Sequence, residues 1–445
     1  MNKKFLTGVL IIVFTAVGII AYNNFFVCEK IPALLPRTND SNVSAEYLNA
    51  QRTVDYYREQ IRKNPGDPKN YVELAQVFLQ EARVTGKDHE YVPSAMDLID
   101  RALALDKTNL DAKLTKANIF LTQHQFEKTK EIGEWAVEKY PYSSSAFAIL
   151  TDAYVELGEY EKAVKTCDKL LSIKPDLRAY SRASYIRELH GQKESAISAM
   201  RLAADAGVTG QENRAWVLYN LGNLYLQAGK IDTAAFIYNG ILQERPSYAF
   251  AQAGLSKVMI AKKNYSLALK HSIKAFELMP EHSFIEQKAD LYLAMGKKEV
   301  EKKLINEVIV ALKEDEARGW NVDLELARFC LNHNVNLKEA FTRAEREFKR
   351  RGNNIEVKTV YAIALYKMNN LNRAVKIIDE AVRFNPQNPL THYYAGVIYS
   401  ALGKSDFAIH HLEKSLTKGF ACSPVFYTDA QQRISSIKNK FLAGR

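Results

Sequence analysis

Cysteine is scarce in this chain, and its spacing excludes the sites that cysteine usually builds. The four cysteines (Cys28, Cys167, Cys330 and Cys422) lie far apart, with no C-x-x-C pair. Neither a disulfide framework nor a zinc site has such spacing. We therefore interpret them as isolated thiols, of which Cys167 and Cys330 fall on helix faces that should be buried.

The local signatures of common enzymes are also missing. The sequence contains no G-x-x-x-x-G-K-[ST], G-x-G-x-x-G, G-x-S-x-G or H-E-x-x-H pattern, which supply phosphate cradles, nucleophiles or zinc ligands. The nine histidines are dispersed, and adjacent His410 and His411 would point about 100° apart on a helix. We predict no catalytic residue, no metal site and no cofactor, and therefore a protein that is not an enzyme.

Charge of one sign is only in modest excess. The 61 Lys and Arg residues against 51 Asp and Glu give a net charge of +10, and the basic residues are scattered through the chain. A dispersed excess is weak support for binding nucleic acid, although it is compatible with anionic surfaces. We expect no nucleic-acid partner.

One long apolar run stands at the amino terminus. Residues 5–22 are 18 consecutive uncharged residues, and the run extends to Val27. At 1.5 Å per residue the run measures about 27 to 34 Å, enough to cross a hydrocarbon core of roughly 30 Å. Lys3 and Lys4 favour a cytoplasmic amino terminus. We predict a transmembrane helix through residues 5–27, within an anchor of residues 1–27, that places the remaining chain outside the cytoplasm, in a bacterial periplasm.

Two other fates of this segment remain open, and both leave the rest of the chain outside the cytoplasm. A signal peptidase could cut after Ala21, although the bulky Ile19 lies two positions earlier. A lipoprotein would instead be acylated at Cys28, although bulky residues precede it. The following residues, 28–43, carry two prolines and a polar cluster and are predicted to form an extended linker.

The remainder of the chain is built from a repeat of 34 residues. Pro141 is followed by Pro175, and Pro246 by Pro280, and such a period is typical of solenoids made of helix pairs. Within each unit a small residue recurs on both helices, where the backbones must approach each other. These residues are Ala75, Ala117, Thr151, Ser184, Gly222, Ser256, Ala289, Ala327, Ala362 and Gly396 on the first helices, and Ala95, Thr129, Ala163, Ala196, Ala234, Ala268, Glu301, Ala340, Ala374 and Ala408 on the second.

This pattern resembles the tetratricopeptide repeat family, most clearly in residues 216–246. The resemblance implies an all-α fold, a right-handed superhelical solenoid of about ten helix-turn-helix repeats that follows the transmembrane helix. We place a leading helix at 44–67, the ten repeats at 68–422 and a capping helix at 423–445. Weak repeats predict two blocks that meet near 310–320, and residues 86–93 are expected as an insertion between the helices of the first repeat.

The resemblance also implies where binding occurs, because first helices line the concave groove in this family. The residues that it assigns to a protein-binding groove are Arg178, Arg182, Tyr185, Trp216, Tyr219, Asn220, Asn223, Phe250 and Lys257. Aromatic, Arg and Asn side chains are suited to recognition. Packing of Trp216 and Phe250 against the preceding repeat is the alternative.

Two hypotheses for the function follow. The first is a membrane-tethered scaffold or adaptor that binds a protein or peptide segment in its groove and organises an envelope complex. The second is an assembly factor that binds an envelope glycan or a lipid-linked intermediate.

Overall fold

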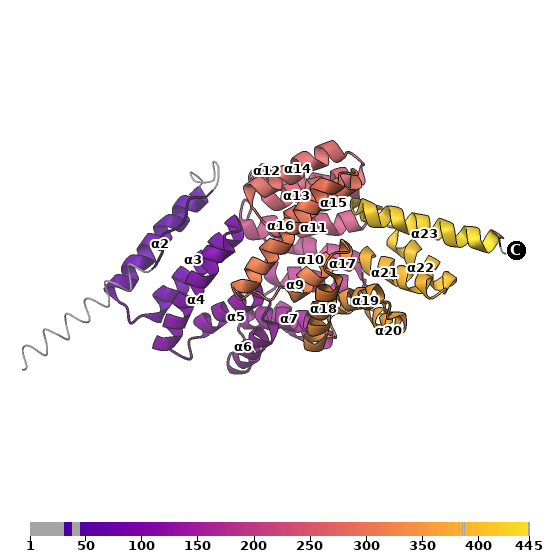
Figure 1. Ribbon diagram of the computed structural model, residues 1–445. Coiled ribbons are helices and arrows are strands. Elements are labelled where there is room, and N and C mark those ends of the chain that lie inside the picture. Colours follow the sequence, from indigo (N-terminus) through magenta and orange to yellow (C-terminus); the bar gives the residue numbers. More distant parts are fainter. Residues whose placement is uncertain (1–30, 38–44, 385, 387, 444–445) are drawn as a thin grey trace, which may run out of the picture. The chain divides into compact units, whose positions relative to one another are not determined.

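A computed structural model describes residues 31–37, 45–384, 386 and 388–443. They divide into two compact units, Met1–Ile119 and Phe120–Arg445. All regular elements of the described residues are helices (Figure 1). The predicted transmembrane segment, with Ala21 and Cys28, lies outside the described residues. Among the helices that are described, none combines the length and the apolar character needed to cross a membrane.

The first unit contains a helix pair that follows one single helix. Its helices are α2 (Ala45–Lys63), α3 (Pro68–Thr85) and α4 (Asp88–Leu105), and α5 (Leu110–Thr122) crosses the boundary between the units. Asp67 caps α3 by accepting a hydrogen bond from the Lys69 N–H at 3.0 Å, and Pro68 occupies the first helical position, where its missing N–H costs nothing. Gly86 ends α3 with a left-handed backbone (φ 69°).

The expected insertion at residues 86–93 is helical. Only Gly86 and Lys87 lie between α3 and α4, and residues 88–93 form the start of α4, in which Tyr91 and Val92 are buried. The structure corrects this expectation. Pro93 lies in the second turn of α4, where it forgoes one backbone hydrogen bond, and its buried neighbours Tyr91 and Val92 hold that turn in the core.

Part of the predicted linker at 28–43 is docked onto the first unit. Residues 31–37 have no regular structure, yet the Arg37 Nε donates a 3.0 Å hydrogen bond to Glu81 Oε2 in a buried ion pair, and a backbone N–H of this segment donates to the Tyr91 hydroxyl at 3.0 Å. A buried guanidinium is stable only with such a partner. This part of the chain is therefore not a free spacer.

The second unit is a series of helix pairs. Its helices are α6 (Phe126–Lys139), α7 (Ser144–Glu156), α8 (Tyr160–Ile173), α9 (Leu177–Leu189), α10 (Lys193–Asp205), α11 (Glu212–Gln227), α12 (Ile231–Glu244), α13 (Ala249–Ala261), α14 (Tyr265–Leu278), α15 (His282–Ala294), α16 (Lys298–Ala317), α17 (Asp323–Asn332), α18 (Leu337–Arg351), α19 (Ile355–Lys367), α20 (Leu371–Val382), α21 (Pro389–Ala401), α22 (Ser405–Ser415), the 3₁₀ helix η2 (Lys418–Cys422) and α23 (Pro424–Ala443). From α7 to α22, each odd-numbered helix packs against the even-numbered one that follows it.

The small residues that set the repeat lie where the two helices of a pair cross. All of them are buried except Glu301. Where serine replaces alanine or glycine, its hydroxyl is satisfied by the partner helix: Ser184 Oγ donates to the Ala196 carbonyl at 2.7 Å, and Ser256 Oγ to the Ala268 carbonyl at 2.9 Å. A small polar residue therefore keeps the close approach without an unpaired buried group.

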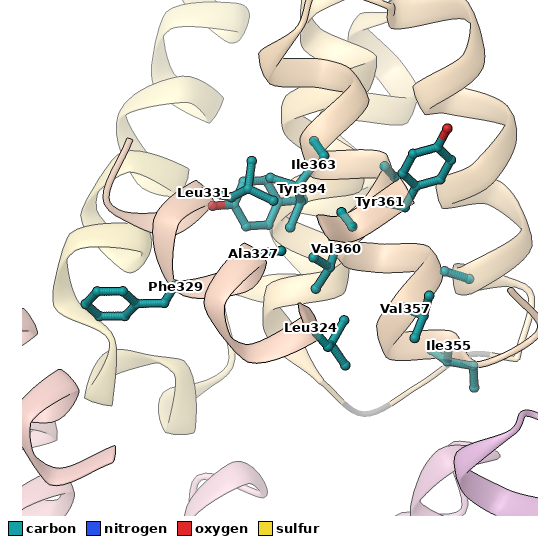
Figure 2. Close-up of a cluster of buried hydrophobic side chains, with 14 of the residues drawn as sticks. Leu324, Ala327, Phe329, Leu331, Ile355, Val357, Val360, Tyr361, Ile363 and Tyr394 are labelled. Carbon is teal, nitrogen blue, oxygen red and sulfur yellow. The ribbon is translucent and has the colours of Figure 1, made fainter. Parts of the chain in front are cut away.

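The largest apolar core joins helices that are distant in sequence. It includes residues of α7 to α10 as well as residues of α15 to α23. Figure 2 shows its centre, where Leu324 and Ala327 of α17 face Val357 and Val360 of α19, with Tyr394 of α21 beside Leu331. Apolar surface that the early hairpins would otherwise expose is thus covered by the late ones.

The second unit curves until its early hairpins touch its late ones. The carboxamide of Asn354 donates to the Glu156 carbonyl at 3.1 Å, while its oxygen caps α19. Arg351 donates to the same carbonyl at 3.0 Å, and the Ile355 N–H donates to the Tyr160 hydroxyl at 2.9 Å. The free carbonyl at the end of α7 is thus satisfied by the side chains of Arg351 and Asn354, and the free N–H at the start of α19 by a side chain of α8.

A glycine permits this contact. Gly158 has φ +75°, and a Cβ there would lie 2.4 Å from the Asn353 carbonyl carbon. Further contacts join the same regions: the Asn321 N–H donates to the Gln123 carbonyl at 3.0 Å. The junction between two blocks that the sequence predicted near 310–320 lies inside the second unit. It is next to Asn321, which takes part in these contacts between early and late hairpins.

Replacement of Gly158 by alanine should break the closing contact. The left-handed backbone alone costs about 1–2 kcal/mol for an alanine, and the clash with Asn353 should add about 1–3 kcal/mol. Gly403 is a matched control, because its φ is +71° and no atom lies within 4 Å of a Cβ built there. Urea denaturation should show that Gly158→Ala loses more stability than Gly403→Ala. Equal losses would contradict the contact.

Candidate functional site

The residues that the sequence assigned to a groove lie on three first helices, α9, α11 and α13, which pack side by side in the second unit. Those on α9 are largely engaged already. Arg182 donates to Asp152 and to the Ala148 carbonyl of the preceding repeat, whereas Arg178 is exposed at the start of α9, 3.8 Å from Asp176. Arg182 therefore holds two repeats together, and of these two arginines only Arg178 presents an exposed guanidinium.

Trp216, Tyr219 and Phe250 form the centre of an aromatic cluster. The Phe250 ring lies 5.2 Å from Trp216 and 5.4 Å from Tyr219 between centroids. Tyr248 and Phe284 complete the cluster, at 5.8 Å and 5.3 Å from Phe250. Edge-to-face and tilted contacts of this kind add to the area that the rings bury.

One side of the aromatic cluster is buried in the protein and the other side is exposed to solvent. Tyr219 and Phe284 are buried, with 8% and 3% of their surface exposed, whereas Trp216 retains 42%. Phe250 thus packs between repeats, whereas Trp216 presents a ring to solvent that Phe250 supports. That this surface is a protein-binding groove stays a prediction. Rigid aromatic surface binds partners at little entropic cost.

The two asparagines of α11 bond within the protein. Asn220 donates its carboxamide N–H to the Trp216 carbonyl at 2.8 Å, and Asn223 accepts from the Tyr238 hydroxyl at 2.9 Å. Lys257 Nζ lies 6.0 Å from the centroid of the Tyr219 ring, and this tyrosine raises the pKa of Lys257 while burial lowers it. The charged group beside the cluster is therefore a lysine that stays protonated.

Tyr238 forms the floor beneath this surface. It is fully buried, and its ring fits a slot between two helices, since a Cβ on Gly222 or Gly254 would lie 2.4 or 2.7 Å from its Cε1. No other residue type fits at these positions without moving the ring. The glycines therefore set the distance between α11 and α13.

Acidic side chains gather on neighbouring first helices. Burial raises the pKa of Glu156 (α7) to about 6, against the effect of Arg351. Tyr185 (α9) is 43% exposed, and burial, Glu156 and Glu356 (α19) raise its pKa well above the usual value. Acidic side chains of α7 and α19 thus lie close to Tyr185, one of the residues assigned to the groove.

Asp290 of α15 is the most strongly perturbed of these carboxyl groups. Its pKa is raised to about 8, first by burial and then by Glu286, while 43% of its side-chain surface remains exposed. His333 lies 3.6 Å away, and burial lowers the pKa of this imidazole. Arg328, 3.5 Å from Glu286, supplies a positive charge beside these carboxyl groups.

No group of three metal-ligating side chains occurs among the residues that the structure describes. Cys167 and Cys330 are buried free thiols and Cys422 is half-buried. His411 does meet another histidine, but this is His392, with 3.1 Å between their Nδ1 atoms. Burial lowers the pKa of both rings to about 4, so that they are neutral at pH 7.

Tyr248 and Phe284 belong to the aromatic cluster but were not among the groove residues predicted from the sequence. Phe284 had a signal, because Trp216, Phe250 and Phe284 follow one another at the repeat step of 34 residues. Asp290 had none, since its neighbours on α16 and α17 meet it only in the folded array.

Comparison with known families identifies the repeats. Two tetratricopeptide repeat models match residues 145–177 and 216–248, which cover α7 with α8 and α11 with α12. The chain therefore contains tetratricopeptide repeats. The second match begins at Trp216 and ends at Tyr248, two residues of the aromatic cluster.

Two curated proteins are similar to parts of the chain. The Vi polysaccharide export protein VexE of Salmonella typhi is 31% identical over 184 residues, 39% of this chain and 26% of that protein. A TPR repeat-containing protein of Methanocaldococcus jannaschii is 20% identical over 394 residues, 88% of this chain and 57% of that protein. The chain thus spans well under two thirds of the length of either relative.

Solved structures of repeat proteins are also similar. A thermophilic TPR protein of Thermus thermophilus has 18% identity and a TM-score of 0.36, covering 46% of this chain and 98% of that one. The Cut9–Hcn1 hetero-tetramer of the APC/C has 15% identity and a TM-score of 0.44, covering 93% and 66%.

Gly254→Ala should destabilise the second unit by about 1–3 kcal/mol, because the added methyl group displaces the buried Tyr238 ring. Gly240, on α12, is the control: nothing lies within 4 Å of a Cβ there, so Gly240→Ala should stabilise the helix by about 0.5–1 kcal/mol. Thermal unfolding of both variants checks the opposite signs. An unchanged melting temperature of Gly254→Ala would contradict the close fit of the Tyr238 ring against Gly254.

Asp290→Asn should stabilise the protein in a pH-dependent way. Because the folded pKa is about 8 and an unfolded aspartate has a pKa of about 4, the folded state binds more protons between these values, and stability falls as pH rises through this window. The variant mimics the protonated form, so its gain in melting temperature should be larger at pH 8.5 than at pH 5. A pH-independent effect of Asp290→Asn would contradict the raised pKa.

Proposed function

We propose that this protein is an interaction scaffold that binds a segment of another protein over the aromatic cluster. Tetratricopeptide repeats are modules of protein–protein interaction, and the observation that carries the proposal is the supported, 42% exposed ring of Trp216. Phe250 braces that ring from the next repeat, and Lys257 adds a positive charge at one side. A partner segment would lay an apolar side chain on Trp216 and a carboxylate or carbonyl near Lys257.

The proposal includes a location. The apolar run of residues 5–27 and the two lysines before it support a single membrane anchor with the repeats outside the cytoplasm. In that position the scaffold would organise an envelope complex from the membrane surface. The similarity to a Salmonella export protein is compatible with such a location.

Trp216→Ala should reduce capture of the partner. The tagged full chain is recovered from detergent-solubilised membranes, and co-purified proteins are quantified by mass spectrometry. A tryptophan that acts as an interface hot spot contributes about 2 kcal/mol or more, so capture should fall by more than about tenfold. Phe236→Ala is the control, because Phe236 is 79% exposed on α12 and lies outside the cluster. Equal capture by wild type and both variants would contradict the proposal.

A second candidate is an assembly factor for an envelope glycan or lipid-linked intermediate. Its support is the 31% identity with the Vi polysaccharide export protein over 184 residues, together with an exposed indole ring, a surface on which sugar faces can stack. A glycan array probed with the full chain, and again with Trp216→Ala, separates the candidates. Glycan binding that depends on Trp216 would favour this function over the protein scaffold.

A further inference from the structure

The C-terminal segment of the chain packs on α11 and α13, two of the helices that carry the candidate site. The 3₁₀ helix η2 contacts both α11 and α13, and α23 packs on α15 and α21; Figure 1 shows α23 in yellow, starting beside α15. Most other first helices of the second unit contact the next first helix and their own second helix. Here a segment from the end of the chain is added on top of them.

Two residues place this segment against the end of α11 and the core beneath the candidate site. The backbone of Gly419 meets the end of α11, since a Cβ there would lie 2.1 Å from the Leu226 carbonyl oxygen. Cys422 packs against the core that contains Tyr219 and Tyr238. It also interacts electrostatically with Lys257.

Phe420 anchors the same segment on its other side. This ring is 4% exposed and belongs to the large core, with centroids 6.2 Å from Tyr393 and 6.4 Å from Tyr427. The segment 419–422 therefore bridges two cores. Phe420 is held by the C-terminal helices, whereas Gly419 lies against the end of α11 and Cys422 against the core that contains Tyr219 and Tyr238.

The attachment to the candidate site is weaker than the anchor. Gly419 offers no side chain to bury, and Cys422 remains half-buried, whereas Phe420 buries a whole ring. Burial of apolar area is the main source of such attachment. Release from α11 and α13 while Phe420 stays in place is thus the less costly opening.

We infer that residues 419–422 form a strap that occupies the Lys257 end of the candidate site and competes with a partner segment for it. The inference rests on the proposed function, because it assigns a built-in competitor to the same surface. An internal segment has a high effective concentration and lowers the apparent affinity of any external one. A partner would therefore bind fully only after the strap has left.

The test uses the full chain with two changes that release the strap by different routes. Gly419→Val forces the segment off the Leu226 carbonyl, and Phe420→Ala removes its anchor without adding bulk. Gly240→Ala is the control, since its new methyl group meets no atom within 4 Å. If one releasing variant does not fold, the other still gives the answer.

Two readouts are needed. The first is the rate at which a maleimide modifies Cys422, mapped by peptide mass spectrometry, with the buried Cys167 and Cys330 as internal references. The second is the affinity of a fluorescein-labelled peptide of residues 416–424 added in trans. Both releasing variants should show modification about tenfold faster and peptide binding about tenfold tighter than wild type, and the control should show neither.

Unchanged modification of Cys422 in both variants would overturn the inference, and so would faster modification without peptide binding. Either failure is distinct from failure of the proposed function. Capture of a partner that depends on Trp216 but does not increase in the releasing variants would leave the scaffold standing without a strap. Peptide binding without any captured partner would leave the strap standing without the scaffold.

Discussion

The contact between Gly158 and the Asn353–Asn354 backbone determines the form of the second unit. An array of helix pairs needs contacts only between neighbours, and nothing in the repeat itself brings α7 to α19. Here a left-handed glycine lets two chain segments approach, and Asn354, Arg351 and Tyr160 then satisfy backbone groups at both helix ends. The early and late hairpins consequently share one core, and the candidate site lies on helices of the same closed unit.

The local architecture was predictable because it depends on spacing. Alanine, glycine and serine at fixed intervals identify helix crossings, and the burial of these positions agrees with that reasoning. The helical start of α4 was not predictable, because the long spacing between Ala75 and Ala95 indicates only an insertion until Tyr91 and Val92 are known to enter the core. The closing contact was also hidden, since Gly158 looks like any glycine after a helix.

In the candidate site, too, some features could be predicted from repeat spacing and others depend on the folded structure. Trp216, Tyr219 and Phe250 could be placed on one face from their repeat positions, and they do form a cluster. Asn223 and Arg182 could be placed as well, but their hydrogen bonds within the protein depend on Tyr238 and Asp152 in other helices. The strap of residues 419–422 lies outside the repeat pattern, so its position against α11 and α13 could not be predicted from that pattern. The site therefore combines a surface set by the repeat with partners set by the closed fold.

Hydrogen exchange at the Ile355 amide tests the closed arrangement most directly. This N–H lies at the start of α19, where a helix has no partner for it, and its acceptor is the Tyr160 hydroxyl, 195 residues away. The account predicts slow exchange at Ile355 in the native protein and fast exchange in Tyr160→Phe. Exchange at the rate of an open helix start in both proteins would contradict it.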